Sequence, residues 1–316
     1  MTVQHPVNDR ARVAVAVALA AGVCGAVQPK VNAVLGSRVG SALVASLVNF
    51  TVALALVIVA ISLRPATRRR LAALRTWPVP RWTLTAGLGG AVIVLAGAVA
   101  VDTIGVAIFS VAFFAGQITF GLLVDGIGVG PGGKRPITAA RVQAVLLAVV
   151  AVALSQLGRP VGEFAPALVA LVVAAGAAFA FQSAFNGRIA LATGDPVAAT
   201  AVNVTVGITA LIAIVGVLAA IGRLGPLDWP AQPWLYTGGA LGVTVVLSLA
   251  VATAALGVLR ATLAMLAAQL IGAFVVDWVG EHRPPTAGAI AGALLIVAAV
   301  ALLSRRSTPV AASVGA

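Results

Sequence analysis

Two stretches, GVCGAVQPKVN (residues 22–32) and GAAFAFQSAFN (residues 176–186), both carry a glutamine followed four positions later by an asparagine. Gln28 aligns with Gln182 and Asn32 aligns with Asn186, at a shift of 154 residues. Both stretches lie within apolar runs, where an amide is costly unless it meets protein or water. The fold prediction therefore starts from a polar pattern that occurs twice in an apolar chain.

The correspondence between the two halves of the chain continues beyond these stretches. Three more polar pairs align, the first at a shift of 154 residues and the other two at 152: Asn49 with Asn203, Gln117 with Gln269, and Asp125 with Asp277. Self-similarity over such a distance indicates a duplicated structural unit. We therefore expect two copies of one unit, residues 1–160 and 161–316.

Composition places both copies in a membrane. Hydrophobic residues make up 61% of the chain and charged residues only 9%, with a mean hydropathy of +1.12, whereas about a quarter of a soluble protein is charged. A helix needs about 20 apolar residues to cross a bilayer. Ten runs approach this length, at residues 12–36, 40–63, 82–102, 104–124, 138–157, 165–188, 195–220, 233–255, 257–279 and 286–304. These runs predict an all-α polytopic membrane protein with ten transmembrane helices.

Five helices in each copy determine the relative orientation of the copies. Because five is odd, the second copy starts on the opposite side of the membrane, and the two repeats are inverted. If the N-terminus is cytoplasmic, 15 of the 20 Lys and Arg residues fall in cytoplasmic regions, as the positive-inside rule requires. We therefore expect both termini in the cytoplasm. The net charge of +12 is then explained by anionic lipid headgroups, and no nucleic-acid partner is expected.

Several functional classes lack their residues in this chain. One cysteine and two histidines do not supply a typical zinc or iron site, and no Walker-type loop for ATP occurs. No Ser/His/Asp set falls within the predicted spans. We therefore expect no catalytic residue, no metal and no cofactor, and we do not expect an enzyme.

The first copy also carries a longer motif. The Gln-x-x-x-Asn order, followed by GQ and then LLVDGIGVGPGGKRPITAARV within residues 116–142, resembles the YdcZ (DUF606) family of the drug/metabolite transporter (DMT) superfamily. The second copy departs from the motif, with HRPPT (282–286) in place of KRPIT (134–138). The resemblance implies an EamA/DMT-like fold of two inverted five-helix bundles. It places helices 1–4 and 6–9 around a central cavity and helices 5 and 10 outside.

The repeated amides allow two interpretations. Residues four apart share one face of a helix, so Gln28 with Asn32, and Gln182 with Asn186, each form a polar patch. These patches either bond neighbouring helices together or line a polar pathway between the halves, and the sequence favours neither. The complete set of candidate pathway residues is Gln28, Asn32, Asn49, Gln117, Gln182, Asn186, Asn203 and Gln269.

Asp125 and Asp277 are the only acidic residues at equivalent places in both copies. An ionisable residue inside a membrane is a functional candidate, because burying its charge is costly. Both residues lie at predicted helix ends, so capping or pairing with a loop arginine is the other interpretation. As gate or coupling residues, they would pair with Lys134 or Arg135 at one end and with Arg283 at the other.

These observations favour a secondary active or facilitative transporter, or exporter, of a small organic solute in the bacterial cytoplasmic (inner) membrane. The alternative is a non-transporting membrane subunit or scaffold that packs against a partner. The expected partners are the lipid bilayer and a small-molecule substrate. The small-residue motif GAIAG (288–292) fits packing within a monomer or a homodimer contact, so both oligomeric states are open.

Overall fold

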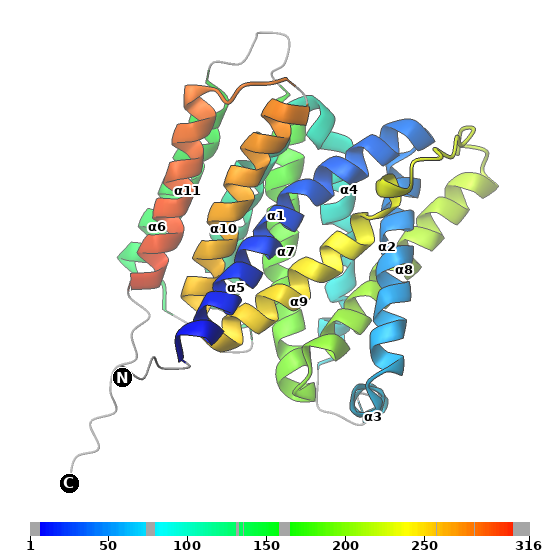
Figure 1. Ribbon diagram of the computed structural model, residues 1–316, viewed down its shortest axis with the longest axis horizontal. Coiled ribbons are helices and arrows are strands. Elements are labelled where there is room, and N and C mark those ends of the chain that lie inside the picture. Colours follow the sequence, from blue (N-terminus) through cyan, green and yellow to red (C-terminus); the bar gives the residue numbers. More distant parts are fainter. Residues whose placement is uncertain are drawn as a thin grey trace, which may run out of the picture.

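The computed structural model describes residues 7–73, 80–130, 133–134, 136–157, 165–256, 258–280 and 282–305. These residues are arranged as a bundle of helices, and no β-strand occurs among them (Figure 1). A helix occupies each of the ten ranges expected from the sequence. The all-α prediction is therefore confirmed for the described part of the chain.

The helices of the first half are α1 (Val7–Val39), α2 (Ala42–Ser62), α3 (Pro65–Ala73), α4 (Ala86–Ile104), α5 (Val106–Ile127) and α6 (Ala139–Ser155). Those of the second half are α7 (Pro166–Thr193), α8 (Pro196–Ala220), α9 (Gly238–Leu256), α10 (Val258–Val275) and α11 (Ala287–Arg305). Short 3₁₀ turns, Arg81–Thr85 and Pro233–Tyr236, precede α4 and α9. A π-helical turn, Val276–Gly280, continues α10.

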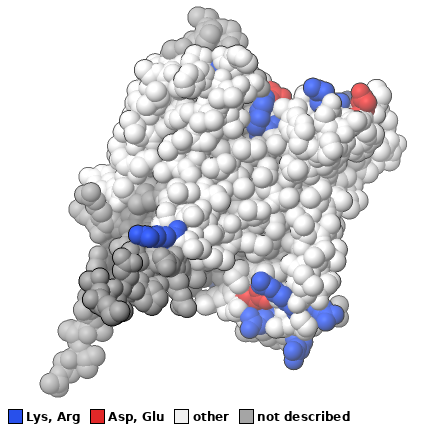
Figure 2. All heavy atoms as spheres, in the orientation of Figure 1, with Lys and Arg blue, Asp and Glu red and all other residues white. Residues whose placement is uncertain are grey.

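Six helices in the described residues are long and apolar enough to cross a bilayer: Arg12–Val39, Ala42–Ser62, Arg81–Ile104, Val106–Ile127, Pro166–Thr193 and Pro196–Ala220. Four shorter apolar helices accompany them: Ala139–Ser155, Gly238–Ser248, Ala264–Gly280 and Ala287–Leu302. Figure 2 shows most charged side chains gathered at the upper right and the lower right of the visible face and one basic side chain at the left, with a broad uncharged band between the two groups. Such a band matches the hydrocarbon layer of a membrane.

The first long helix of each half packs against the other half. α1 contacts α9 and α10, and α7 contacts α4 and α5. Figure 1 shows α1 and α9 running side by side across the molecule. The remaining contacts between the halves include α2 with α8 and α6 with α11. The two halves are therefore interleaved, and residues from both can meet in the interior.

Glycines allow the closest of these helix crossings. A methyl group added at Gly176 on α7 would lie 2.0 Å from the carbonyl oxygen of Phe113 on α5. A methyl group added at Gly22 on α1 would lie 2.2 Å from the carbonyl oxygen of Met265 on α10. Because both distances are far below van der Waals contact, only glycine fits, and the helices approach backbone to backbone.

One helix, α3, was not predicted from the sequence, whereas the GAIAG motif makes a helix contact of the kind that we considered. The helix α3 lies in a stretch that we expected to be only a break between spans. Pro65 begins α3, where its missing N–H costs nothing and its φ is already helical. The GAIAG motif packs inside the chain, since a methyl group at Gly288 would lie 2.2 Å from the carbonyl oxygen of Leu154 on α6.

The α7–α5 crossing yields a stability prediction. We expect Gly176→Ala to lower the free energy of unfolding by about 2 kcal/mol or more, because the new methyl group overlaps the α5 backbone. Gly216→Ala on α8 is the matched control, since a methyl group there meets nothing within 4 Å. The control should be neutral or stabilising by up to about 1 kcal/mol. Denaturant unfolding in one detergent compares the two variants, and equal effects would contradict the close crossing.

Candidate functional site

A cavity of about 150 Å³ lies between helices of both halves. Residues of α1, α2 and α4 line it from the first half, and residues of α7, α8 and α9 line it from the second. Five of the eight predicted pathway amides are among the lining residues: Gln28, Asn49, Gln182, Asn186 and Asn203. The structure therefore brings amides from the two halves, distant in sequence, to one internal space.

The first-half amides of the cavity are bonded to each other. Gln28 Nε2 donates to Asn49 Oδ1 at 3.4 Å, and Asn49 is only 5% exposed. The α9 glycines make room for them, since a methyl group at Gly242 would lie 2.6 Å from Gln28 Nε2. Gly239 lies against the backbone of Asn49, where an added methyl group would be 2.1 Å from the carbonyl oxygen. Gln28 and Asn49 therefore pack against a face of α9 that carries glycines at the points of contact.

The second-half amides of the cavity are not paired in this way. Gln182 Oε1, Asn186 Oδ1 and Asn203 Nδ2 are all buried without a hydrogen-bond partner. Gly90 on α4 lies beside two of these side chains, because an added methyl group would be 3.1 Å from Asn203 Oδ1 and 3.4 Å from Gln182 Oε1. A buried polar atom without a partner costs about 1–3 kcal/mol. Asn32 Oδ1 and Gln269 Oε1 are also unpaired, but only Gln182, Asn186 and Asn203 belong to the cavity lining.

The other three predicted amides lie at helix crossings outside the cavity lining. Asn32 is 2% exposed, and its Oδ1 would be 2.2 Å from a methyl group at Gly238. Gln269 lies against Gly25 on α1. The backbone nitrogen of Gln117 would be 2.8 Å from a methyl group at Gly176. No residue of α5 or α10 is among the described lining residues, although the resemblance implied that the fourth and ninth helices surround the cavity.

Asp277 connects the two halves at one end of the bundle. Its Oδ1 accepts from the backbone N–H of Val106 at 2.7 Å, and its Oδ2 accepts from that of Ala107 at 2.8 Å. These are the first N–H groups of α5, which have no partner within their own helix. A carboxylate at this position also interacts favourably with the positive end of the helix dipole. Asp277 therefore caps a helix of the first half from the second half.

A π-helical turn, a glycine between two helices and a second cavity surround the Asp277 carboxylate. The π-helical turn Val276–Gly280 interrupts the regular helix at Asp277, and Gly105, with φ of 79°, separates α4 from α5. Asp277 also lines a second cavity of about 320 Å³, together with His282, Arg283 and Thr286. Arg283 donates its backbone N–H to the Asp277 carbonyl at 3.0 Å.

Asp125 has a different environment. Its carboxylate is bonded by Arg141 of α6, and both side chains are partly exposed. The pairing with Lys134 that we considered from the sequence is replaced by this one, and Arg135 lies outside the described residues. Arg141 lies in the first turn of α6 and bonds Asp125 near the end of α5, which the sequence separation did not reveal. The two aspartates are therefore not equivalent in their contacts.

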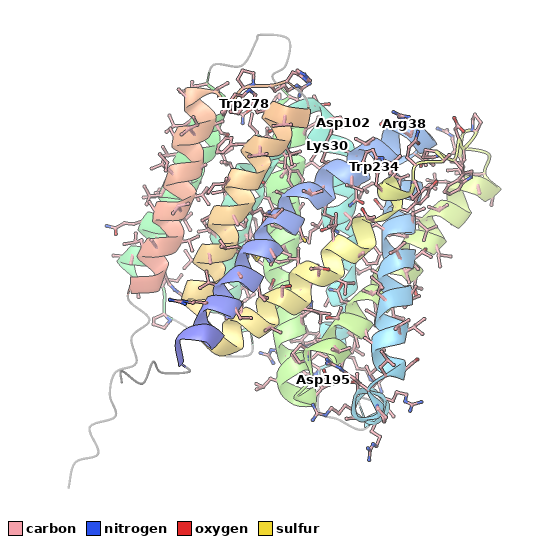
Figure 3. The ribbon with its side chains drawn as sticks, viewed as in Figure 1. Lys30, Arg38, Asp102, Asp195, Trp234 and Trp278 are labelled. Atoms are coloured by element: carbon pink, nitrogen blue, oxygen red, sulfur yellow. The ribbon has the colours of Figure 1, made fainter. Side chains whose placement is uncertain are left out.

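Polar contacts that the sequence analysis missed join helices at the same end as Asp277. Lys30 Nζ lies 2.7 Å from Asp102 Oδ1, and Figure 3 shows this pair at the end opposite Asp195. Arg283 Nη1 donates to the carbonyls of Asp102 and Thr103 at 3.3 and 3.4 Å. In the sequence, Lys30 and Asp102 are opposite charges near the ends of two apolar runs, and this pattern could have predicted the pair.

At the opposite end, α3 contacts the turn between α7 and α8. Thr67 Oγ1 donates to Asp195 Oδ2 at 2.6 Å, in a buried position. Asp195 Oδ1 accepts from the N–H of Val197 at 2.9 Å and so caps α8. Arg70 Nη1 donates to the Gly194 carbonyl at 2.6 Å. An aspartate directly before Pro196 at a helix start was the sequence signal for this cap.

Arg188 makes a second connection from α7 to the first half. Its Nε donates to the Val129 carbonyl at 2.6 Å, and its Nη2 donates to the Gly128 carbonyl at 2.7 Å. Its guanidinium also lies 5.4 Å from the ring centre of Trp82, within the range of a cation–π interaction. Contacts between the halves therefore exist at both ends of the bundle.

Comparison with known protein families identifies the chain. The family model described as "Putative inner membrane exporter, YdcZ" matches residues 13–154 and 167–302. The chain belongs to the YdcZ family. Together with its apolar helices, this membership makes it a multi-pass protein of the bacterial inner membrane and a transporter or exporter. No curated protein matched the chain.

The described residues of this YdcZ-family protein contain no group of three or more His, Cys, Asp or Glu side chains that could hold a metal ion. The cavity between the halves is instead lined by amides, glycines, one hydroxyl and apolar side chains. Such groups form hydrogen bonds but do not take up or release protons near neutral pH. The described lining can therefore bind a molecule through hydrogen bonds and apolar contacts.

The different contacts of the two aspartates give a second stability prediction. We expect Asp277→Ala to lower the free energy of unfolding by about 2–3 kcal/mol, because it leaves two buried N–H groups of α5 without acceptors. Asp125→Ala is the matched control and should lower the free energy of unfolding by about 1 kcal/mol or less, as expected for a partly exposed ion pair. Unfolding curves of both variants in one detergent provide the measurement. A larger loss from Asp125→Ala would contradict the capping role of Asp277.

Proposed function

We propose that this protein is a secondary active or facilitative transporter that exports a small organic solute by alternating access. The cavity between the halves is the proposed substrate site. The observation that carries this proposal is the presence of three buried, unpaired amide atoms, on Gln182, Asn186 and Asn203, at one internal space. Substrate pockets are concave and mostly apolar, with a few polar groups that fix orientation, and this cavity has that composition.

The proposed architecture is a pair of inverted five-helix repeats, residues 1–160 and 161–316, in which all ten apolar helices cross the membrane. Family membership in two segments supports the duplication. The contacts support it too, because α1 meets α9 and α10 as α7 meets α4 and α5. The closest crossings use equivalent residues: Gly22 faces the backbone of Met265 and Gln269, and Gly176 faces that of Phe113 and Gln117.

Access to the cavity would alternate through the contacts at the two ends. At one end, Asp277 caps α5, and Arg283 contacts the end of α4. At the other end, Asp195 and Arg188 connect α8 and α7 to the first half. In the proposed cycle, one set of contacts opens while the other remains closed. Asp277 then acts as a gate residue, and Asp125, through Arg141, sets the position of α6 against α5.

The proposed orientation places both termini in the cytoplasm. The start of α1, the end of α11 and the helix α3 lie toward the same end of the molecule (Figure 1), and Asp195 lies at that end in Figure 3. Arg68, Arg69 and Arg70 of α3 then contribute to the positive charge of the cytoplasmic side. In this orientation, Asp277 lies near the outer face of the membrane.

A flux measurement tests the proposed function. Liposomes containing the purified protein are loaded with a defined mixture of small organic solutes, and mass spectrometry follows what is lost. We expect at least one solute to leave about tenfold faster than from protein-free liposomes. The double variant Gln182→Leu/Asn203→Leu should slow that solute about tenfold or more, because each tenfold corresponds to about 1.4 kcal/mol of lost stabilisation.

The control for this measurement is Gln143→Leu, which removes an exposed amide on α6, outside the cavity. Its flux should equal that of the unmodified protein. Equal loss of every solute from liposomes with and without the protein would contradict transport. That result would favour the alternative of a non-transporting membrane subunit, in which the same amides only bond helices together.

A further inference from the structure

The charges around the cavity carry an inference about the substrate. None of the lining residues that the structure describes is an Asp, Glu, Lys, Arg or His. Lys30, two residues beyond Gln28 on α1, is bonded to Asp102, and neither residue is among the described lining. Asp125 and Asp277 are also absent from the described lining. The polar atoms facing the cavity are therefore uncharged.

An uncharged cavity discriminates strongly against ions. Moving an ion out of water costs several kcal/mol, and this cost is offset only by an opposite charge or by several well-placed hydrogen bonds. Within the described lining, no opposite charge is available for a carboxylate or an ammonium group. A neutral solute of the same shape does not incur this cost. The cavity therefore favours a solute without net or separated charge.

The unpaired amide atoms indicate which hydrogen-bonding groups the solute carries. Gln182 Oε1 and Asn186 Oδ1 are acceptors without a partner, so they require donors such as N–H or O–H on the solute. Asn203 Nδ2 is a donor without a partner and requires an acceptor. The hydroxyl of Thr200 already donates to the Pro196 carbonyl at 2.9 Å. A solute with donor hydrogens and an acceptor oxygen or nitrogen, as in a primary amide, carries the kinds of partner that these three amide atoms lack.

The rest of the cavity wall is apolar and limits the size of the solute. Phe50, Phe179, Ile93 and Val94 are among the lining residues. A cavity of about 150 Å³ lined by apolar side chains is large enough to hold benzene, and the volume here is also about 150 Å³. A small solute with a compact apolar body in addition to its hydrogen-bonding groups therefore fits this volume.

We propose that the cavity binds a small, neutral, amphipathic solute with hydrogen-bond donors and an acceptor at one side of an apolar body. The proposal rests on the proposed function for the role of this cavity in transport. It adds the chemical class of the substrate. It also implies that the binding step itself moves no charge of the solute into the membrane.

Three shape-matched probes test the charge preference: benzamide, which is neutral, benzoate, which is an anion, and benzamidinium, which is a cation. The thermal unfolding midpoint of the detergent-solubilised protein is measured with each probe at one concentration. A ligand that binds only the folded state raises the midpoint according to its concentration and Kd. We expect benzamide to raise the midpoint at least about threefold more than either ion, since charge burial opposes the ions.

Variants connect the shift to the cavity. In Asn203→Leu and in Gln182→Leu, the shift caused by benzamide should fall by at least about half, because one of its hydrogen bonds is lost. In Gln143→Leu, on the exposed side of α6, the shift should be unchanged. If a variant folds poorly, its midpoint without probe shows this directly, and the other variant supplies the comparison.

The outcomes separate this proposal from the proposed function. A shift from benzoate or benzamidinium that equals that of benzamide, and that the cavity variants abolish, would overturn the neutral class while leaving the cavity as a binding site. The absence of any shift with benzamide would also overturn it, whatever the flux measurement shows. Cavity-dependent binding of benzamide without flux of any solute would support the inferred ligand class and contradict transport.

Discussion

The cost of placing amide groups inside an apolar bundle is the constraint on which this structure depends. A membrane offers no water to the side chains within it, so each buried amide must find a partner in the protein or in a cavity. Gln28 and Asn49 meet this requirement by bonding to each other. Gln182, Asn186 and Asn203 each keep one buried atom unpaired. Asn32 and Gln269, at helix crossings, each keep one unpaired atom as well, so it is the unpaired atoms together with a cavity lined by residues of both halves that support a binding site.

Small residues make the arrangement sterically feasible. Glycines on α1 and α7 let these helices approach α10 and α5 at backbone distance, and glycines on α4 and α9 leave space beside the amides. The interleaving of the halves follows, because α1 and α7 each pack against the other half. Contacts such as Asp277 with α5 and Asp195 with Thr67 then join the halves near their two ends. A cavity between the halves, with contacts between them near both ends, fits the alternating access that we propose.

Run length was sufficient to predict the ten helical ranges, and the Gln-x-x-x-Asn order with the longer motif in residues 116–142 was sufficient to predict the family. They did not determine which amides face the cavity, because Asn32, Gln117 and Gln269 belong to the same polar pattern but lie at helix crossings. That distinction depends on helix rotation and crossing position, which apolar sequences with weak amphipathicity do not specify. Capping was one of the interpretations of Asp277, but the sequence did not show which helix it caps, since its partners are backbone N–H groups 170 and 171 residues away. The Asp195 cap, by contrast, was readable from the order Asp-Pro at a helix start.

The central claim, that the amides face a space open to small molecules, is tested most directly by the reactivity of a single cysteine. Gln182→Cys, in a Cys24→Ser background, is treated with N-ethylmaleimide in native membranes, and Ala175→Cys on the same helix, where the native residue is 0% exposed, is the control. Thiols react as thiolates, which form in a hydrated cavity and not in a dry packed seam. The account predicts labelling at position 182 and none at position 175. Labelling of the position 182 cysteine only after unfolding would contradict it.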